Sequence, residues 1–387
     1  MKLLNCSAEE FIKRLNNKKV ICFGAGTTLI QAQTEDAKIE HLEEHIAFFV
    51  DNDKKKQEIK YEYYNKKFDI KSVEAFKDID VGGYVLLITC SSYADIYHQL
   101  KDMPEIQDME CYMYELVCFG SEIDIENFFI REINKHSYKD RKSILSEMHL
   151  KDKHKNQRCF IIGNGPSLRI EDLELLKDEV TFAANAVYLC FDQTDWRPTY
   201  YFCVDNRGYG RIHDEINHVE AQCRFVPYLS ALLAGKVYDE ITYYNRQYQG
   251  ACIEGNKISL NNNYKFSDNV EEVVYQGTTV VYDAIQFAVY MGFSEIYLLG
   301  VDFSFQLEYQ PDGSVMETDA ERDHFIDNYN RNFENLVPAT PIYAMKWAYQ
   351  KAKEVCDQKG IIIRNATRGG KLEVFERVSF DSLIKKF

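Results

Sequence analysis

The 387-residue chain is short of positive charge and of long apolar runs. It carries 46 Lys and Arg residues against 61 Asp and Glu, a formal net charge of −15, whereas general nucleic-acid binding needs a positive face. No apolar run reaches the roughly 18 residues of a membrane span, and the N-terminus lacks the apolar core of a signal peptide. We therefore expect a cytoplasmic protein with no integral membrane segment and no nucleic-acid partner.

The sequence also lacks a convincing metal-binding pattern. Its 11 cysteines are scattered without a C-x-x-C pair, which favours buried thiols in a reducing compartment. The stretch from His41 to His45 matches H-x-x-E-H but runs directly into an apolar strand. Asp51 and Asp53 spell D-x-D, which could hold a metal but is more typical of a turn with Asx hydrogen bonds. We predict no resident metal ion.

Strand and helix signals alternate in both halves of the chain. Continuous apolar strands linked by helices predict parallel sheets covered on both faces. The first half has such runs at 20–23, 46–50, 85–88 and 110–114, and the second at 159–163, 180–184, 198–204, 223–228, 295–301 and 360–364. Helices are predicted over 279–291 and near 341–358. The expected architecture is α/β, with a Rossmann-like accessory domain over 1–115, a helical connector over 116–157 and a catalytic domain over 158–387.

Each half opens with a strand followed by Gly-x-Gly. Gly24-Ala25-Gly26, with Asp51 ending the next strand, resembles the start of a dinucleotide fingerprint. The third glycine of that fingerprint is missing because Leu29 occupies its place. Nucleotide binding and a purely structural or partner-binding domain both remain open, and the latter is favoured.

The second turn, Gly163 to Ser167, is the stronger candidate for an anion site. Its glycines allow close approach, its proline fixes the turn, and its serine can cap the following helix. An ordinary strand-to-helix turn explains residues 159–168 equally well. Polar residues also end other strands of this half, where ligands of open α/β sheets bind: Asn185, Asp205, Asn206, Asp302 and Ser304.

Two further features of the second half suit chemistry. Thr278 and Thr279 precede a predicted helix and add two hydroxyls at its N-terminus. His324 lies between Asp323 and Asp327, so it has a potential orienting acid and a pKa suited to general-base work. An exposed histidine without a function fits the local sequence as well.

Three stretches together resemble a known family: IIGNGPSL at 161–168, GTTVVYDAIQFAVYMGFSEIYLLGVDFSF at 277–305, and DHFIDNY at 323–329. They look like the bacterial family of 6-hydroxymethylpterin pyrophosphokinase MptE-like proteins, which includes motility accessory factors that glycosylate flagellin. The order of motifs is also similar to that of bacterial CMP-sialic-acid sialyltransferases. The resemblance covers roughly residues 158–330 and implies a GT-A-like α/β catalytic domain with a mostly parallel sheet.

The resemblance also implies roles for residues of this chain. Nucleotide and donor sugar would be held by Asn164, Gly165, Pro166, Ser167, Asn185, Asp205, Asn206, Thr278, Thr279, Asp302 and Ser304. His324 would deprotonate the acceptor hydroxyl. The chain departs from the sialyltransferases at Ser304, where they carry a tyrosine that assists the leaving phosphate, and Tyr309 is the candidate replacement. This departure puts the donor sugar in doubt more than the reaction type.

The expected function is a glycosyltransferase that moves an acidic, nonulosonic-type sugar from a CMP donor to a surface-glycan or protein acceptor. Inversion would follow direct attack by the acceptor, and no cofactor would be required. One alternative is a pyrophosphokinase of the pterin type that needs Mg²⁺ and ATP, with Asp205 and Asp302 as metal ligands. Another is a non-catalytic sugar- or nucleotide-binding scaffold. The sequence leaves open whether the chain forms a homo-oligomer.

Overall fold

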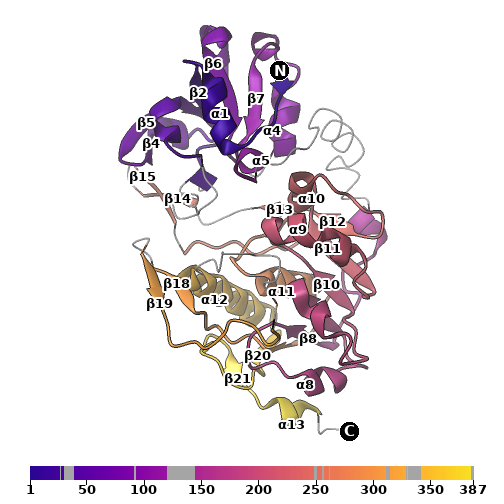
Figure 1. The fold of residues 1–387 in the computed structure, drawn as a ribbon. Coiled ribbons are helices and arrows are strands. Elements are labelled where there is room, and N and C mark those ends of the chain that lie inside the picture. Colours follow the sequence, from indigo (N-terminus) through magenta and orange to yellow (C-terminus); the bar gives the residue numbers. More distant parts are fainter. Residues whose placement is uncertain are drawn as a thin grey trace. The chain divides into compact units, whose positions relative to one another are not determined.

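The fold is that of a computed structural model. It describes residues 1–26, 28–29, 39–90, 93–119, 144–247, 251–254, 257–260, 262–310, 314–327, 329 and 341–384. The chain divides into two compact units (Figure 1). Unit 1 comprises Met1–Ser137 and Tyr248–Asn263, and unit 2 comprises Tyr138–Gln247 and Tyr264–Phe387. Most of the predicted connector, from 120 to 143, lies outside the described residues.

Unit 1 is built on a seven-stranded sheet in the order β1-β7-β6-β2-β3-β5-β4. Only the β4–β5 pair is antiparallel among the described strand pairs of this sheet. The four predicted apolar runs form β2, β3, β6 and β7, and a separate hairpin, β14–β15, completes the unit. The strands are β1 (Lys2–Leu3), β2 (Lys19–Phe23), β3 (Ile46–Val50), β4 (Lys60–Tyr63), β5 (Lys66–Lys71), β6 (Tyr84–Ile88), β7 (Glu110–Met113), β14 (Ala251–Glu254) and β15 (Lys257–Leu260). The helices are α1 (Ala8–Leu15), α3 (Leu42–His45), α4 (Tyr93–Leu100) and α5 (Tyr114–Phe119).

Unit 2 contains an eight-stranded sheet in the order β12-β11-β10-β9-β8-β17-β20-β21, and every pair in it is parallel. Its strands are β8 (Arg158–Ile162), β9 (Thr181–Ala184), β10 (Tyr200–Phe202), β11 (Cys223–Pro227), β12 (Thr242–Tyr244), β17 (Glu295–Leu299), β20 (Ile362–Asn365) and β21 (Glu376–Arg377). Short pairs are formed by β13 (Arg246–Gln247) with β16 (Val274–Tyr275), and by β18 (Leu307–Tyr309) with β19 (Val315–Glu317). The helices are α8 (Ile170–Glu174), α9 (Asn206–Asn217), α10 (Tyr228–Ala234), α11 (Val280–Tyr290), α12 (Ile342–Lys359) and α13 (Phe380–Ile384). The predicted class, α/β with mostly parallel sheets, is confirmed.

The strand order of unit 2 fixes where a ligand is expected. From β8 the chain adds β9, β10, β11 and β12 on one side, and then returns to place β17 on the other side of β8. The order therefore reverses between β8 and β17. In open parallel sheets, ligands bind outside the carboxyl ends of the strands at such a reversal.

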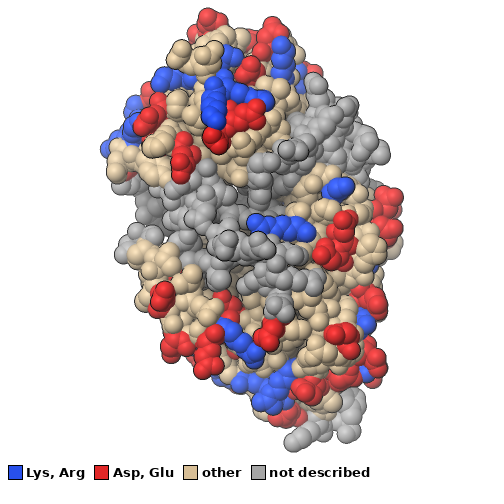
Figure 2. Space-filling view, in the orientation of Figure 1, with Lys and Arg blue, Asp and Glu red and all other residues tan. Residues whose placement is uncertain are grey.

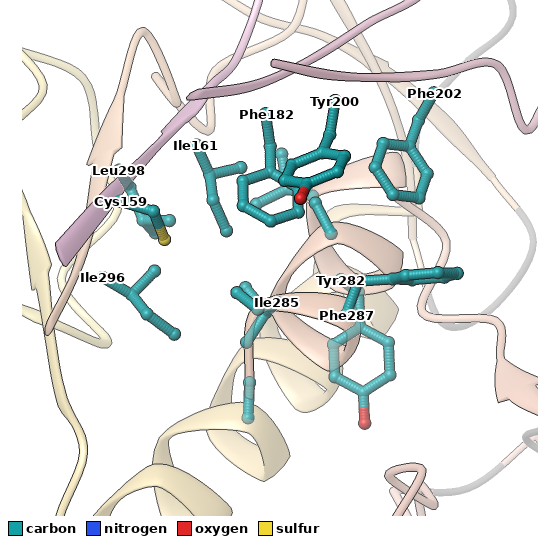
Figure 3. Packing of buried hydrophobic residues seen from close by; sticks show 14 of the residues in the cluster. Cys159, Ile161, Phe182, Tyr200, Phe202, Tyr282, Ile285, Phe287, Ile296 and Leu298 are labelled. Carbon is teal, nitrogen blue, oxygen red and sulfur yellow. The ribbon is translucent and has the colours of Figure 1, made fainter. Parts of the chain in front are cut away.

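The core of unit 2 is rich in aromatic side chains that pack between the sheet and α11 (Figure 3). Phe182 and Phe202 on neighbouring strands have ring centroids 6.1 Å apart, and the Phe202 ring meets the edge of Phe287 on α11 at 5.1 Å. Thr279 caps α11 by accepting a hydrogen bond from the Val281 N–H at 3.3 Å. This packing holds the N-terminus of α11 at the carboxyl edge of the sheet, because the helix leads into the start of β17.

Several expectations about composition can be compared with the structure. All ten cysteines whose side chains are described are free thiols. Among the described helices, none combines the length and the apolar character needed to cross a bilayer. On the face drawn in Figure 2, acidic and basic side chains of the described residues are interspersed.

Candidate functional site

The glycine turn after β8 packs against the end of β17. The Gly163 N–H donates to the Leu299 carbonyl at 2.8 Å, and the Gly165 N–H donates to the Gly300 carbonyl at 2.9 Å. A Cβ on Gly163 would lie 2.4 Å from the Gly300 oxygen, and one on Gly165 would lie 2.0 Å from Asp302 Oδ2. Only glycine permits this approach. The Gly165 amide therefore joins the two strand ends and is not directed at a ligand.

Ser167 and Asp302, both predicted to bind the donor, are brought together across the reversal of strand order. Ser167 donates to Asp302 Oδ2 from its hydroxyl at 2.8 Å and from its N–H at 3.4 Å. Asp302 is only 7% exposed, and burial raises the pKa of its carboxyl while the hydrogen bonds from Ser167 oppose that shift. Pro166 lies between Gly165 and Ser167 in the same turn. Ser167 and Asp302 thus stabilise the turn by forming hydrogen bonds with each other.

Asn164 is the residue of the turn that has capacity left for a ligand. Its Nδ2 donates to the Ala184 carbonyl and to the Tyr329 hydroxyl, both at 2.9 Å. A carbonyl can only accept, so the amide nitrogen must face Ala184 and the orientation of the side chain is fixed. The remaining atom, Asn164 Oδ1, is buried and has no hydrogen-bond partner among the described residues.

Asn185 presents a second acceptor of the same kind. It follows β9 with φ at 52°, and its carbonyl accepts from the Tyr201 hydroxyl at 2.6 Å. Its Oδ1 is also buried without a partner among the described residues. A buried polar atom left unpaired costs about 1–3 kcal/mol. A ligand that offers hydroxyl or amino hydrogens to these two oxygens would recover that energy, whereas the acceptor-only oxygens of a phosphate would not.

His324 lies against the same turn. The Phe325 N–H donates to the Asn164 carbonyl at 3.0 Å, which holds the residue after His324 against the turn. The imidazole stacks on Tyr329, with ring centroids 3.6 Å apart and 20° between the planes. In a neutral imidazole one ring nitrogen carries the proton and the other is a free base. Burial lowers the pKa of His324, with the charge of Asp323 acting in the opposite direction, so the ring is neutral near pH 7.

The orienting partner of His324 differs from the one that the sequence suggested. Asp323 and Asp327 flank the histidine in the chain, yet the Tyr329 ring stacks on the imidazole and the Asn164 carbonyl binds the adjacent Phe325 N–H. Asp323 Oδ1 accepts from the Gln306 N–H at 2.7 Å and so fixes the loop, and Asp327 is exposed. A partner some 160 residues away in the chain cannot be read from the local sequence.

The other predicted residues lie at the same carboxyl edge of the sheet. Their side chains differ in exposure and in the hydrogen bonds that they already make. Thr278, just before α11, has φ at 59° and donates from its hydroxyl to the Gly277 carbonyl at 2.6 Å. Asp205 follows β10 and is exposed, and Ser304 is half-buried beyond β17. Asn206 begins α9, but its side chain and that of Tyr309 lie outside the described part of the chain.

Backbone strain gathers at this edge. Asn185, Thr278 and Phe303 have φ of 52°, 59° and 56°, values that are uncommon for residues other than glycine and unusual for a β-branched or bulky one. Each costs about 1–3 kcal/mol, and such residues cluster at functional sites. They follow β9, precede α11 and follow β17, respectively, which adds independent support for a site there.

Two tyrosines of the cluster were not assigned a role from the sequence. Tyr201, on β10, is fully buried, and its hydroxyl holds the Asn185 backbone. Tyr329 closes the DHFIDNY stretch that carried the family resemblance, but nothing local shows that its hydroxyl reaches Asn164. The resemblance of the DHFIDNY stretch to the family was the one sequence signal that pointed to Tyr329.

In unit 1, the glycine turn at Gly24–Gly26 is occupied by a side chain of the protein itself, that of Asp51. Asp51, the potential ribose ligand, accepts from the Ala25 N–H at 2.8 Å and from the Asp53 N–H at 2.9 Å, and pairs with Lys56 at 2.9 Å. The second of these is the Asx hydrogen bond that the D-x-D stretch suggested. Asp51 is 8% exposed. Its carboxylate thus supports the turn, which is the structural interpretation of Gly24–Gly26.

The comparisons with known proteins concern mainly unit 2. Residues 135–308, somewhat under half of the chain, match one family model. The family is described as 6-hydroxymethylpterin diphosphokinase MptE-like. The resemblance predicted from the three motifs is confirmed over this segment, whereas the DHFIDNY stretch lies beyond it.

No curated protein matches the sequence. Among solved structures, the chain is similar to the sialyltransferase CstII from Campylobacter jejuni, determined in complex with a substrate analogue, cytidine-5'-monophosphate. The identity is 15%, the TM-score is 0.34, and the match covers 58% of this chain and 86% of that one. A similarity this low adds nothing to the fold assignment, which rests on the sheet topology.

Proposed function

We propose that the chain is a glycosyltransferase that moves an acidic, nonulosonic-type sugar from a CMP donor to a hydroxyl of a glycan or protein acceptor. The observation that carries the proposal is the state of His324. Its ring is half-buried, has a lowered pKa and stacks on Tyr329, and a neutral imidazole has one nitrogen free to accept a proton. The next residue, Phe325, is bound to the backbone of Asn164, whose amide oxygen is unpaired among the described residues, at the strand ends where the order of the sheet reverses.

The proposed reaction needs only one proton transfer by the protein. The free ring nitrogen of His324 takes the proton of the acceptor hydroxyl, and the acceptor oxygen attacks the anomeric carbon. The bond between that carbon and the phosphate oxygen of CMP breaks, and CMP leaves with the electron pair, so the configuration inverts. A positioned base contributes roughly 10²–10⁴ to such a step.

The unpaired oxygens of Asn164 and Asn185 suit the hydroxyls of a ribose or a sugar. Because the amide nitrogen of Asn164 already binds Ala184 and Tyr329, its oxygen would recognise a hydrogen-bond donor of the ligand. The single phosphate of CMP would fall to the N-terminus of α11, where Thr278 and Thr279 stand and the helix dipole favours an anion. No metal is required by this arrangement.

The family description favours a second candidate, diphosphate transfer to a pterin. That reaction takes ATP with Mg²⁺, which prefers ionised carboxylates. Asp302 is a poor ligand for this purpose, since it is buried and its Oδ2 already accepts two hydrogen bonds from Ser167. This geometry is the reason that we place the transferase first.

Thermal-shift titration separates the candidates. CMP, UDP, GDP and ATP would each be added to the full chain, once with Mg²⁺ and once with EDTA. We expect CMP to raise the melting temperature equally in both buffers. A shift with ATP only in Mg²⁺ would support the diphosphokinase, and no shift with any nucleotide would support a non-catalytic scaffold.

A further inference from the structure

We propose that Tyr329 is a positioning residue that holds His324 in register with the reacting hydroxyl. This inference rests on the proposed function for its catalytic consequence, although the positioning itself can be measured without turnover. No role in the sequence-based hypothesis falls to Tyr329.

The ring of Tyr329 supports one face of the imidazole. The two centroids are 3.6 Å apart and the planes are 20° from parallel, so the histidine cannot rotate toward that side without losing the contact. The backbone next to the histidine is also held, because the Phe325 N–H donates to the Asn164 carbonyl at 3.0 Å. The stack defines the plane of the ring, and the hydrogen bond holds the backbone that carries it.

The hydroxyl of Tyr329 is tied to the ends of two strands. It accepts from Asn164 Nδ2 at 2.9 Å, and the same Nδ2 donates to the Ala184 carbonyl at 2.9 Å. Asn164 follows β8, and Ala184 ends β9. The tyrosine therefore fixes its own ring to the rigid sheet, and through the stack it fixes a histidine that otherwise lies on a loop.

The contacts of Tyr329 distinguish a residue that positions His324 from one that only fills space in the core. Asn164 contacts both sides of the stack, since its side chain donates to the Tyr329 hydroxyl and its carbonyl accepts from the Phe325 N–H, next to His324. The charged or titratable groups recorded around His324 are Asp323 and Tyr329.

Two substitutions test the proposal, with a control. Tyr329→Phe keeps the stacking ring and removes its anchor, and Tyr329→Leu removes both. Tyr238→Phe is the matched control, because its hydroxyl also binds a histidine, His213 Nδ1 at 2.7 Å, away from the carboxyl edge. We would record kcat and KM for the CMP-sugar, and the His324 ring resonances over pH 4.5–8 by NMR.

We expect kcat to fall about tenfold in Tyr329→Phe and about 10²-fold in Tyr329→Leu, the loss typical of a misplacement near 1 Å, with KM changed less than threefold. The His324 midpoint should rise toward its ordinary value near 6.5 in Tyr329→Leu, and Tyr238→Phe should change neither readout. An unchanged midpoint and kcat in a folded Tyr329→Leu would overturn the proposal. So would a gain of kcat in Tyr329→Phe, which would show that the hydroxyl blocks the donor site. If the wild-type chain has no transferase activity but the midpoint moves as expected, the proposed function fails and the positioning stands.

Discussion

The close approach of the two strand ends in unit 2 leads to a sharp prediction for Gly165→Ala. The new Cβ would lie 2.0 Å from Asp302 Oδ2 and 2.8 Å from the Gly300 carbonyl, so the carboxylate must retreat by more than 1 Å to reach ordinary contact at 3.4 Å. That movement breaks the hydrogen bonds from Ser167 to the same oxygen. Overpacking costs about 1–3 kcal/mol and each bond to a charged group about 1.5–3 kcal/mol. The sum, with partial relaxation, is a loss of about 3–5 kcal/mol in the free energy of unfolding.

Urea denaturation followed by tryptophan fluorescence measures this loss for unit 2, which contains Gly165. Both tryptophans, Trp196 and Trp347, lie in unit 2, so the signal does not report the unfolding of unit 1. Gly210→Ala on α9 is the control, because a Cβ there meets no atom within 4 Å. We expect the control to be neutral or more stable by up to about 1 kcal/mol. A Gly165→Ala protein as stable as the wild type would refute the close approach and return this glycine to ligand binding.

Two other predictions concern charge. Burial lowers the pKa of His324 below its ordinary 6.5, and the neutral ring is the base, so kcat/KM should stay level above that value and fall only at lower pH; an acid limb centred at or above pH 6.5 would contradict the assigned role. Arg246→Met should cost about 3–5 kcal/mol in urea denaturation, because it removes the charged partner of the fully buried Asp283 at 2.8 Å and leaves, among the described residues, only the Tyr244 hydroxyl bound to that carboxylate. Lys353→Met, which breaks an exposed pair with Asp357, should cost less than about 0.5 kcal/mol, and equal losses in the two variants would argue against the buried pair.

The sequence was sufficient to predict the central strands and the edge at which the site lies. Runs such as Cys159–Ile162 and 296–299 are apolar because both faces of a parallel sheet are covered. The edge strands β1 and β4 were not predicted, since two to four residues with partial exposure carry little periodic signal. The local pattern placed the cap of α11 at Thr278 or Thr279, and the structure shows that Thr279 is the cap.

Partnerships within the site could not be predicted, because they join residues far apart in the chain. Asp302 and Ser167 each fit a ligand contact by type and place, yet they bind each other across 135 residues. The Tyr329 hydroxyl reaches Asn164 across 165 residues. Whether a polar group at a strand end faces a ligand or a neighbour depends on such pairs, and only the packed structure fixes them.

The central claim is that unit 2 transfers a sugar from CMP with His324 as the base. The most direct measurement is the release of CMP from a CMP-activated nonulosonic acid in the presence of EDTA, for the wild-type chain and for His324→Ala. The account predicts release by the wild type and a rate lower by roughly 10²–10⁴ in the variant. Absence of release by a folded wild-type chain, or the same rate in both proteins, would contradict it.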